Sequence, residues 1–396
     1  MGKRKAKQTR ILHSDYRPPE RFAAFPPPTY RASTVLFDTP ASLRARDWRS
    51  RDAYTYGLHG TPTTFTLESQ IAAIEGGEYC ILAPSGLAAI TLVDFAFLRA
   101  GDAALIPENV YGPNRELGDW LASDFDISVR YYDPLIGEGI ADLICPNTRL
   151  VWTEAPGSVT MEVPDIPSIC RAAHEKGAIV ALDNTWSAGL GFDAFAHGVD
   201  VSLQALTKYH SGGSDLLMGA LITREESLHH RIGLAHMRLG MGIGADDAYQ
   251  VLRSLSTMSM RYRQHGESGM AVAQWLGTCP QVSLVLHPAL PDCPGHALYQ
   301  RDFTAPGGLF SFLFHPRYTE QQTDRFIEAL QLFKLGFSWG GVHSLCVPYR
   351  IHAGRKDWQH RDKQLLRLYI GLEAVDDLID DLAQAFRVMD AAPGAP

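Results

Sequence analysis

The chain has 396 residues, of which 45% are hydrophobic and 20% charged, and its 36 basic and 44 acidic residues leave a net charge of −8. This composition excludes a disordered or collagen-like chain, and the length predicts more than one hydrophobic core. The net negative charge gives no whole-chain electrostatic case for binding nucleic acid, which requires clustered positive charge.

The six cysteines are scattered and form no C-x-x-C pair. We therefore predict reduced thiols in a cytoplasmic protein. The basic start, MGKRKAKQTR, is not followed by an apolar run with a cleavage site, so we predict a frayed tail rather than a secretory signal. The most apolar stretch, residues 88–100, contains Asp94 and Arg99 and is shorter than the roughly 20 residues that span a bilayer, so no membrane segment is expected.

Residues 1–60 are rich in proline, arginine and aromatic side chains and show little helical or strand periodicity. We predict an extended arm that lies over another surface. The pattern then becomes regular, because apolar side chains recur at Leu67, Ile71 and Ile74 and two glycines follow. This spacing predicts an amphipathic helix that ends at the glycines.

Short apolar runs then alternate with helical patterns such as residues 164–177. Strands that are buried on both faces read as continuous apolar runs, so this alternation predicts an α/β fold with a mostly parallel central sheet covered by helices. The candidate strands are residues 79–83, 102–107, 127–132, 148–154, 178–183, 201–207 and 216–223.

After about residue 246 the rhythm changes to a long helical stretch, followed by a few strands and helices. This pattern predicts a smaller α+β domain. We therefore divide the chain into an arm over residues 1–60, a large domain over 61–250 and a small domain over 251–396.

Three common site motifs find no support. His229, His230 and His236 lie close together without the H-E-x-x-H spacing, so packed or solvated histidines are favoured over a metal site. The run GMGIG at 240–244 lacks the G-x-G-x-x-G spacing and follows no strand, which indicates a flexible turn. No serine lies in the G-x-S-x-G turn of common hydrolases.

Lys208 and Asp183 each follow an apolar strand. Taken alone, a lysine at a strand end is more often an ordinary surface side chain. Ligands of open α/β sheets, however, bind at the carboxyl ends of the strands, and here two strands bring an amine and a carboxylate to that edge. Pyridoxal phosphate needs this pair, because a lysine forms a Schiff base with its aldehyde and a carboxylate keeps its pyridine nitrogen protonated.

A third feature is the run APSGLAAI, in which Ser85, Gly86 and Leu87 follow an apolar strand and open a helix. Backbone amides at a helix N-terminus, with a glycine that allows close approach, form a phosphate site. Read alone, Ser85 is equally well explained as a helix N-cap.

These residues belong to a series of runs that resembles the Cys/Met-metabolism family of pyridoxal-phosphate enzymes, and within it the β-lyase members. The runs keep the family's order from about residue 50 to 385, which makes the resemblance far more specific than any single motif. They include YGLHGTPT, APSGLAAI, NVYGPN, EAPGSVTMEVPDI, LDNTWSAG, ALTKY, RDFTAPGGLFSF, FSWGGVHSL and RLYIGLE.

The resemblance implies the aspartate-aminotransferase-like fold, known as fold type I, and a set of cofactor contacts. Lys208 would be the Schiff-base lysine, and Asp183 would contact the ring nitrogen. Tyr111 would stack on the ring and help to deprotonate the incoming amine. The phosphate would be bound by Gly86, Leu87 and Thr207, and by Tyr56 from a neighbouring subunit.

The resemblance also implies substrate contacts and an assembly. Arg367 would hold the α-carboxylate of a sulfur amino acid in a bidentate fork, and Ser338, Trp339 and Tyr56 would complete the substrate site. Because the arm with Tyr56 reaches a neighbour, the active unit would be at least a dimer, and the family implies a homotetramer built from dimers.

The chain departs from the family pattern at several positions. An arginine usually stands two residues after the arm tyrosine, where this chain has Leu58, so one cationic phosphate contact is missing. The usual G-H-S-D run has Gly213 in place of its histidine, and His210 is a candidate substitute. Ala205 stands where many relatives carry a serine.

The activity implied is β-elimination of L-cystathionine to homocysteine, pyruvate and ammonia. Trp339 favours this reaction, because γ-acting relatives usually carry a leucine-type residue there. The alternatives left open are a broader cysteine-S-conjugate β-lyase, a γ-acting relative, and a regulatory or interaction protein with weakened catalysis, for which Leu58 and Gly213 would be the signs.

Overall fold

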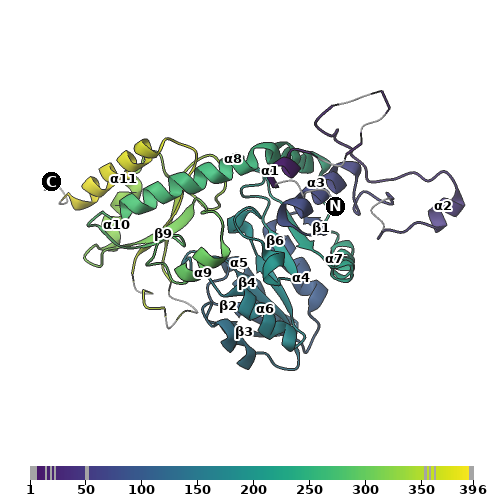
Figure 1. The fold of residues 1–396 in the computed structure, drawn as a ribbon, viewed down its shortest axis with the longest axis horizontal. Coiled ribbons are helices and arrows are strands. Elements are labelled where there is room, and N and C mark those ends of the chain that lie inside the picture. The colour runs from purple at the N-terminus through teal and green to yellow at the C-terminus, as the bar shows by residue number, and fades with distance from the viewer. Residues whose placement is uncertain are drawn as a thin grey trace.

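The computed structural model of the chain describes residues 7–13, 16–17, 20–21, 24–49, 53–351, 355, 358–360 and 363–391. Two β-sheets, each covered by helices, make up the body, and the long helix α8 (Ala245–Leu276) runs from one to the other (Figure 1). The domain boundary predicted at residues 250–251 falls inside α8, so the division into two domains stays a prediction.

The larger sheet has seven strands in the order β1-β7-β6-β5-β4-β2-β3. Strand β7 is antiparallel to both of its neighbours, and the other pairs are parallel. The mostly parallel sheet predicted from the sequence is therefore confirmed. Its strands are β1 (Tyr79–Ala83), β2 (Ala103–Pro107), β3 (Ser128–Tyr132), β4 (Thr148–Glu154), β5 (Ile179–Asp183), β6 (Val201–Gln204) and β7 (Gly219–Thr223).

Both faces of this sheet are covered, as the continuous apolar runs require. In β5, Val180 and Leu182 belong to the core beneath α3 (Pro62–Glu75) and α6 (Ile166–Glu175), whereas Ala181 belongs to the core on the other face. That second core is completed by α4 (Gly86–Phe97), α5 (Gly112–Asp124) and α7 (Glu226–Leu239).

Helix α3 begins five residues before the predicted start. Thr61 and Thr64 form a capping box and Pro62 occupies the first turn, so the local sequence stabilises an earlier start than the apolar spacing indicates. The helix ends at Gly76, whose φ of 92° is a left-handed conformation that glycine adopts without strain. The predicted glycine stop is confirmed.

The smaller sheet has five strands in the order β10-β11-β12-β9-β8. It packs against α8 and the C-terminal helices around a phenylalanine-rich core that includes Phe310, Phe312 and Phe386. Its elements are β8 (Val282–Leu286), α9 (His296–Asp302), β9 (Leu309–Phe314), α10 (Glu320–Ala329), β10 (Lys334–Leu335), β11 (Leu345–Tyr349), β12 (Leu365–Tyr369) and α11 (Val375–Asp390). Among the described residues, three 3₁₀ turns lie within the part of the chain that forms the larger sheet: η1 (Gly137–Asp142), η2 (Thr185–Ser187) and η3 (Ala194–His197).

The N-terminal segment contains two short helices, α1 (Lys7–Ile11) and α2 (Pro40–Arg44). The prediction of a frayed tail is wrong for residues 7–10, because they form α1 with Ile11, which is buried, and the Lys7 amine donates to the carbonyl oxygen of Gly189 at 2.6 Å. Residues 1–6 of that prediction lie outside the described residues. The segment around α2 extends away from both sheets, as expected for an arm (Figure 1). None of the helices in the described part of the chain is long and apolar enough to cross a membrane.

Candidate active site

The amine of Lys208 lies in a buried position just beyond the end of β6. Its Nζ donates a hydrogen bond to Ser338 Oγ at 2.7 Å and lies 5.4 Å from the centre of the Trp339 ring. Burial, assisted by the charge of Arg367 and opposed by Asp183, lowers the pKa of Lys208 to about 8. A substantial fraction of this amine is therefore neutral, and thus nucleophilic, near neutral pH.

The loop that covers Lys208 has an unusual backbone. Ser338 has a φ of 76° and Gly340 a φ of 91°. A Cβ atom at Gly340 would lie 2.6 Å from Cα of Lys208, so only glycine permits this approach. Strained non-glycine residues such as Ser338 persist where the surrounding structure holds them, often at functional sites.

Two carboxylates lie side by side at the carboxyl edge of the large sheet. Glu154 ends β4 and pairs in register with Asp183 at the end of β5. Burial raises the pKa of both groups, and the neighbouring Asp183 helps to raise that of Glu154 to about 8. Hydrogen bonding by Thr185 and the nearby Lys208 oppose the shift at Asp183. Of the two carboxylates, Asp183 is the one whose ionised form the charge of Lys208 favours.

Glu154 also positions Tyr111, which immediately precedes α5. The backbone N–H of Tyr111 donates to Glu154 Oε2 at 2.7 Å, and the Ser158 hydroxyl donates to Oε1 at 2.6 Å. Burial and the two carboxylates raise the pKa of the Tyr111 phenol, which is 42% exposed. Sequence reasoning did not single out Glu154, although its place at the end of a candidate strand was a usable signal.

Arg367 enters the same cluster from β12 of the smaller sheet. Its guanidinium lies 5.3 Å from the centre of the Tyr349 ring. Burial lowers its pKa, against the opposing influence of Tyr349 and Tyr111, and its charge acts on Lys208. A partly desolvated guanidinium that the tertiary structure places beside Lys208 and Tyr111 is suited to binding a carboxylate.

The N-terminus of α4 presents free backbone donors. The Ser85 hydroxyl accepts from the amide of Ala88, whereas the amides of Gly86 and Leu87 precede the first hydrogen bond of the helix. A Cβ atom at Gly86 would lie 2.9 Å from Cβ of Ala205, so glycine allows α4 to approach the end of β6 closely. The Thr207 hydroxyl donates a hydrogen bond to the carbonyl oxygen of Met218 and accepts one from its amide, and this fixes the orientation of the hydroxyl.

Four of the residues discussed above lie elsewhere. Tyr56 is 48% exposed, and its ring packs against His59 of the same arm rather than among the Lys208 cluster. Leu58 packs against the turn at Gly242. His210 is buried, and burial together with Arg261 lowers the pKa of its imidazole to about 3, so it is a neutral core residue. The side chain of Asp215 lies over Gly213.

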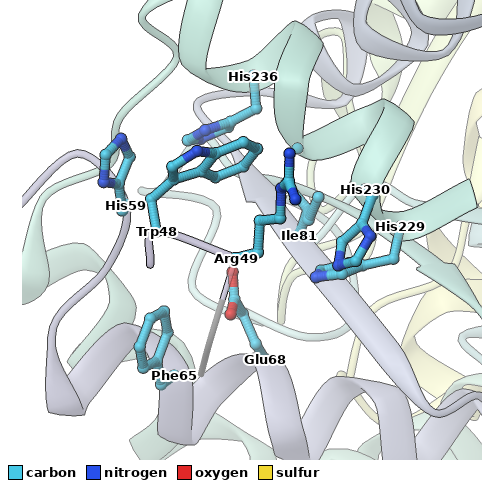
Figure 2. Close-up of a pocket in the computed structure, with 10 residues that line it drawn as sticks. Trp48, Arg49, His59, Phe65, Glu68, Ile81, His229, His230 and His236 are labelled. Carbon is cyan, nitrogen blue, oxygen red and sulfur yellow. The ribbon is translucent and has the colours of Figure 1, made fainter. Parts of the chain in front are cut away.

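A separate small cavity of about 60 Å³ lies between the arm and α7. His59 and Trp48 face it from the arm, and His229, His230 and His236 face it from α7 (Figure 2). Burial lowers the pKa of His59 and of His236. No group that could hold a metal ion occurs among the described residues.

The donors around Lys208 fit pyridoxal phosphate. The site offers a partly buried amine with a lowered pKa, a carboxylate in the same cluster, and the amides of Gly86 and Leu87 at a helix N-terminus, where a Cβ atom on Gly86 would meet Ala205. Pyridoxal phosphate requires an amine to bind its aldehyde, a carboxylate near its ring nitrogen and a site for its phosphate. Gly86, Leu87, Asp183 and Lys208 are the residues that could hold it.

Comparison with known proteins gives a consistent result. The family model described as Cys/Met metabolism PLP-dependent enzyme matches residues 8–387. The chain is 42% identical to a putative cystathionine beta-lyase of Rhizobium johnstonii over 97% of this chain and 96% of that protein. It is 39% identical to the cystathionine beta-lyase of Escherichia coli, over 90% and 92% respectively.

Among solved structures, cystathionine gamma-lyase from Lactobacillus plantarum, complexed with L-serine, superposes with a TM-score of 0.88 at 26% identity. The match covers 98% of this chain and all of the other. The sequence and the fold therefore agree: this chain is a member of the Cys/Met metabolism family of pyridoxal-phosphate-dependent enzymes.

Proposed function

We propose that the chain is a carbon–sulfur lyase that cleaves L-cystathionine by β-elimination, giving homocysteine, pyruvate and ammonia. One observation carries this proposal. Asp183, Tyr111 and Arg367, which come from distant parts of the chain, converge around the amine of Lys208. The relatives named as cystathionine beta-lyases at about 40% identity support the choice of substrate.

Lys208 and Asp183 have complementary parts in this proposal. When bound, pyridoxal phosphate supplies the electron sink for the negative charge that forms at Cα of the substrate. Asp183 would hold positive charge at the pyridine nitrogen. The Lys208 amine would remove the Cα proton and return a proton to the departing sulfur, as a base with a pKa near 8 is suited to do.

Arg367, Ser338 and Tyr111 orient the substrate. The Arg367 guanidinium would bind the α-carboxylate, and Ser338 accepts a hydrogen bond from the Lys208 amine at 2.7 Å. Tyr111 would cover the cofactor ring, and Glu154 keeps the Tyr111 backbone in place. Gly86, Leu87 and Thr207 would hold the phosphate.

Trp339 supports β-elimination over γ-elimination. Its ring stands 5.4 Å from the Lys208 amine and packs against Tyr209, so it bounds the space beside the reacting carbon with a bulky, rigid wall. The likeness to a cystathionine gamma-lyase structure concerns the fold that β- and γ-acting members share, and the reaction is decided by such local contacts.

We further propose that the active form is a cytoplasmic homo-oligomer, built from dimers that pair into a tetramer. The arm extends from the body and exposes Tyr56, which supports its contact with the phosphate of a neighbouring subunit (Figure 1). All six cysteines are unpaired, as expected in a reducing compartment.

The decisive test identifies the keto acid that the cofactor-loaded protein releases from L-cystathionine. Pyruvate with homocysteine supports β-elimination, whereas 2-oxobutyrate with cysteine would establish γ-elimination instead. Lys208→Ala should abolish release of either acid, and a Glu138→Gln variant, altered on the exposed surface, serves as the control that retains full activity.

A further inference from the structure

The segment of residues 157–163 follows Glu154 and contacts the C-terminal half of the chain, which forms the smaller sheet. We call this contact region the seam. The Ser311 hydroxyl of β9 donates to the carbonyl oxygen of Val159 at 2.6 Å. The Cys293 thiol donates to the carbonyl oxygen of Met161 at 3.4 Å, and the amide of Val163 donates to the carbonyl oxygen of Pro294 at 3.1 Å. The C-terminal half therefore holds this segment at successive points.

The backbone of the same segment is strained. Val159 has a φ of 66° and Met161 a φ of 60°. A left-handed conformation is costly for a β-branched residue such as valine and persists only where its surroundings enforce it. The contacts from the C-terminal half therefore help to hold this segment in place, together with hydrogen bonds inside it, such as that from the amide of Met161 to the carbonyl oxygen of Gly157.

The strongest of these contacts is a buried ion pair. Arg355, from the connection between β11 and β12, donates from Nη1 to Glu162 Oε1 at 2.7 Å and to the Thr160 hydroxyl at 2.8 Å. Arg355 is 7% exposed and Glu162 is 2% exposed. Thr160 also donates to Glu162, and Asn109 Nδ2 donates to Glu162 Oε2 at 2.9 Å. A charged pair at this depth costs desolvation that close pairing and hydrogen bonding must recover. Another donor of Arg355, Nε, makes no hydrogen bond among the described residues and lies 3.9 Å from Glu108 Oε2.

Two short paths lead from this pair to the Lys208 cluster. Asn109 stands two residues before Tyr111, and the Gly157 backbone packs directly on its amide, where a Cβ atom would lie 1.9 Å from Nδ2. On the other path, Ser158 lies four residues before Glu162 and donates to Glu154 Oε1 at 2.6 Å. Glu154 in turn accepts from the backbone amide of Tyr111.

We propose that the Arg355–Glu162 ion pair is a positioning device of the active site. It locks the strained segment 157–163 and Asn109 into the arrangement that sets Glu154 and the Tyr111 ring. Arg355 and Glu162 touch neither substrate nor cofactor in this role, and they act through Asn109, Ser158 and Glu154. The proposal rests on the proposed function in that Tyr111 is taken to cover the bound cofactor.

The test replaces both partners together, because removing one would leave a buried charge unpaired. In the double variant Arg355→Met/Glu162→Gln, the Gln carbonyl can still accept from Asn109 and Thr160. We expect kcat/KM for L-cystathionine to fall by roughly ten- to a hundred-fold, mainly in kcat, since small displacements of positioned groups have effects of this size. The visible circular dichroism of the bound cofactor, which reports the surroundings of its ring, should change as well.

The matched control is Arg301→Met. Arg301 also pairs with a carboxylate across the same seam, Asp165 at 2.8 Å, and with its chain neighbour Asp302 at 2.7 Å, but no hydrogen bond links these to Tyr111 or Glu154 among the described residues. It should lower the unfolding temperature and leave kcat and the circular dichroism of the bound cofactor unchanged.

Parental kinetics and parental circular dichroism in the double variant would overturn the proposal, as would equal changes in both variants in proportion to their loss of stability. If the parent protein releases no pyruvate from L-cystathionine, the proposed function fails. The circular dichroism comparison still tests the ion pair in that case.

Discussion

The chemistry of the site begins with the environment of one amine. Lys208 is surrounded by Trp339, Ser338 and the loop at Gly340, which remove it from water. Burial outweighs the attraction of Asp183, and the nearby Arg367 acts in the same direction as burial. The neutral amine is thus available at a pH at which a solvated lysine is almost fully protonated.

The pH dependence of covalent cofactor binding tests this environment. Because the neutral amine is the reacting form, we expect the rate at which apoprotein binds pyridoxal phosphate to rise with pH, to be half-maximal near pH 8 and to level off above about pH 9. Stopped-flow absorbance at the visible band of the bound cofactor measures this rate, with Lys208→Arg as the unreactive control. A rate that still rises above pH 10 would show an ordinary, solvated lysine.

Burial shifts the pKa of Glu154 in the direction opposite to that of Lys208, because it raises the Glu154 pKa from 4.5 to about 8. The folded protein keeps a proton that the unfolded chain releases above its ordinary pKa, so the contribution of this group to stability is lost as pH rises toward 8. Glu154→Gln removes that dependence. We expect the unfolding temperature of the variant, relative to the parent, to increase by several degrees between pH 5 and pH 8.

The exposed Glu138→Gln variant should follow the parent over the same pH range. Thermal unfolding curves for parent and Glu154→Gln that stay parallel from pH 5 to pH 8 would contradict the raised pKa of Glu154.

At the scale of elements, the site is built where strand ends and loops meet. The parallel pairing of β4 with β5 sets Glu154 beside Asp183, and the N-terminus of α4 opens close to the end of β6 because Gly86 lacks a side chain. The loop of residues 338–341 closes over Lys208 from the smaller sheet. Each element contributes one group, and none of them forms the site alone.

Gly340→Ala tests the role of that loop. The added Cβ would meet the Lys208 backbone at 2.6 Å, so we expect the variant to lose cofactor on dialysis and to lose most of its activity. Gly101→Ala is the matched control, since Gly101 also has a positive φ, of 86°, but a Cβ there meets nothing within 4 Å. Both variants should lose roughly 1–3 kcal/mol of stability from backbone strain.

Only the change at Gly340 should alter the cofactor content and absorbance spectrum of the purified protein. Equal cofactor retention by the two variants would mean that the loop does not control the Lys208 position.

At the scale of the whole molecule, the residues assigned to the site come from both sheets and from the arm. The large sheet carries Asp183, Glu154 and Lys208, the smaller sheet carries Arg367, and α8 connects the two cores. The arm holds Tyr56 apart from the cluster of its own chain. An assembly in which arms are exchanged between neighbours would supply the missing contact.

Complementation between inactive chains tests this exchange. In a hybrid dimer of Lys208→Ala and Tyr56→Phe chains, one of the two sites receives a native lysine from one chain and a native tyrosine from the other. With random mixing we expect roughly a quarter of parental activity, because half of the dimers are hybrids with one native site each. The assay is pyruvate release after refolding of the mixed chains.

The same two variants, refolded separately and then mixed without exchange, provide the control. Activity of the refolded mixture that equals the mean of the separate variants would place Tyr56 in the site of its own chain.

Local sequence patterns determined much of this fold. The apolar runs at residues 79–83 and 148–154 became β1 and β4 with the same bounds, and the pattern at 164–177 contains α6. Burial on both faces of a parallel sheet imposes a continuous apolar run, which is readable without neighbours. Asp183 and Lys208 could be assigned to one edge for the same reason, since parallel strands point their carboxyl ends the same way.

Contacts between distant segments were decided only by the tertiary structure. Ser338 reaches Lys208 across 130 positions and Arg355 reaches Glu162 across 193, and neither pair has a local signature. The contact of Lys7, in a segment predicted to fray, with Gly189 has the same origin. Such contacts depend on how two sheets and their connections pack together, and packing is a property of the assembled chain, whereas strand and helix preferences belong to short stretches of sequence.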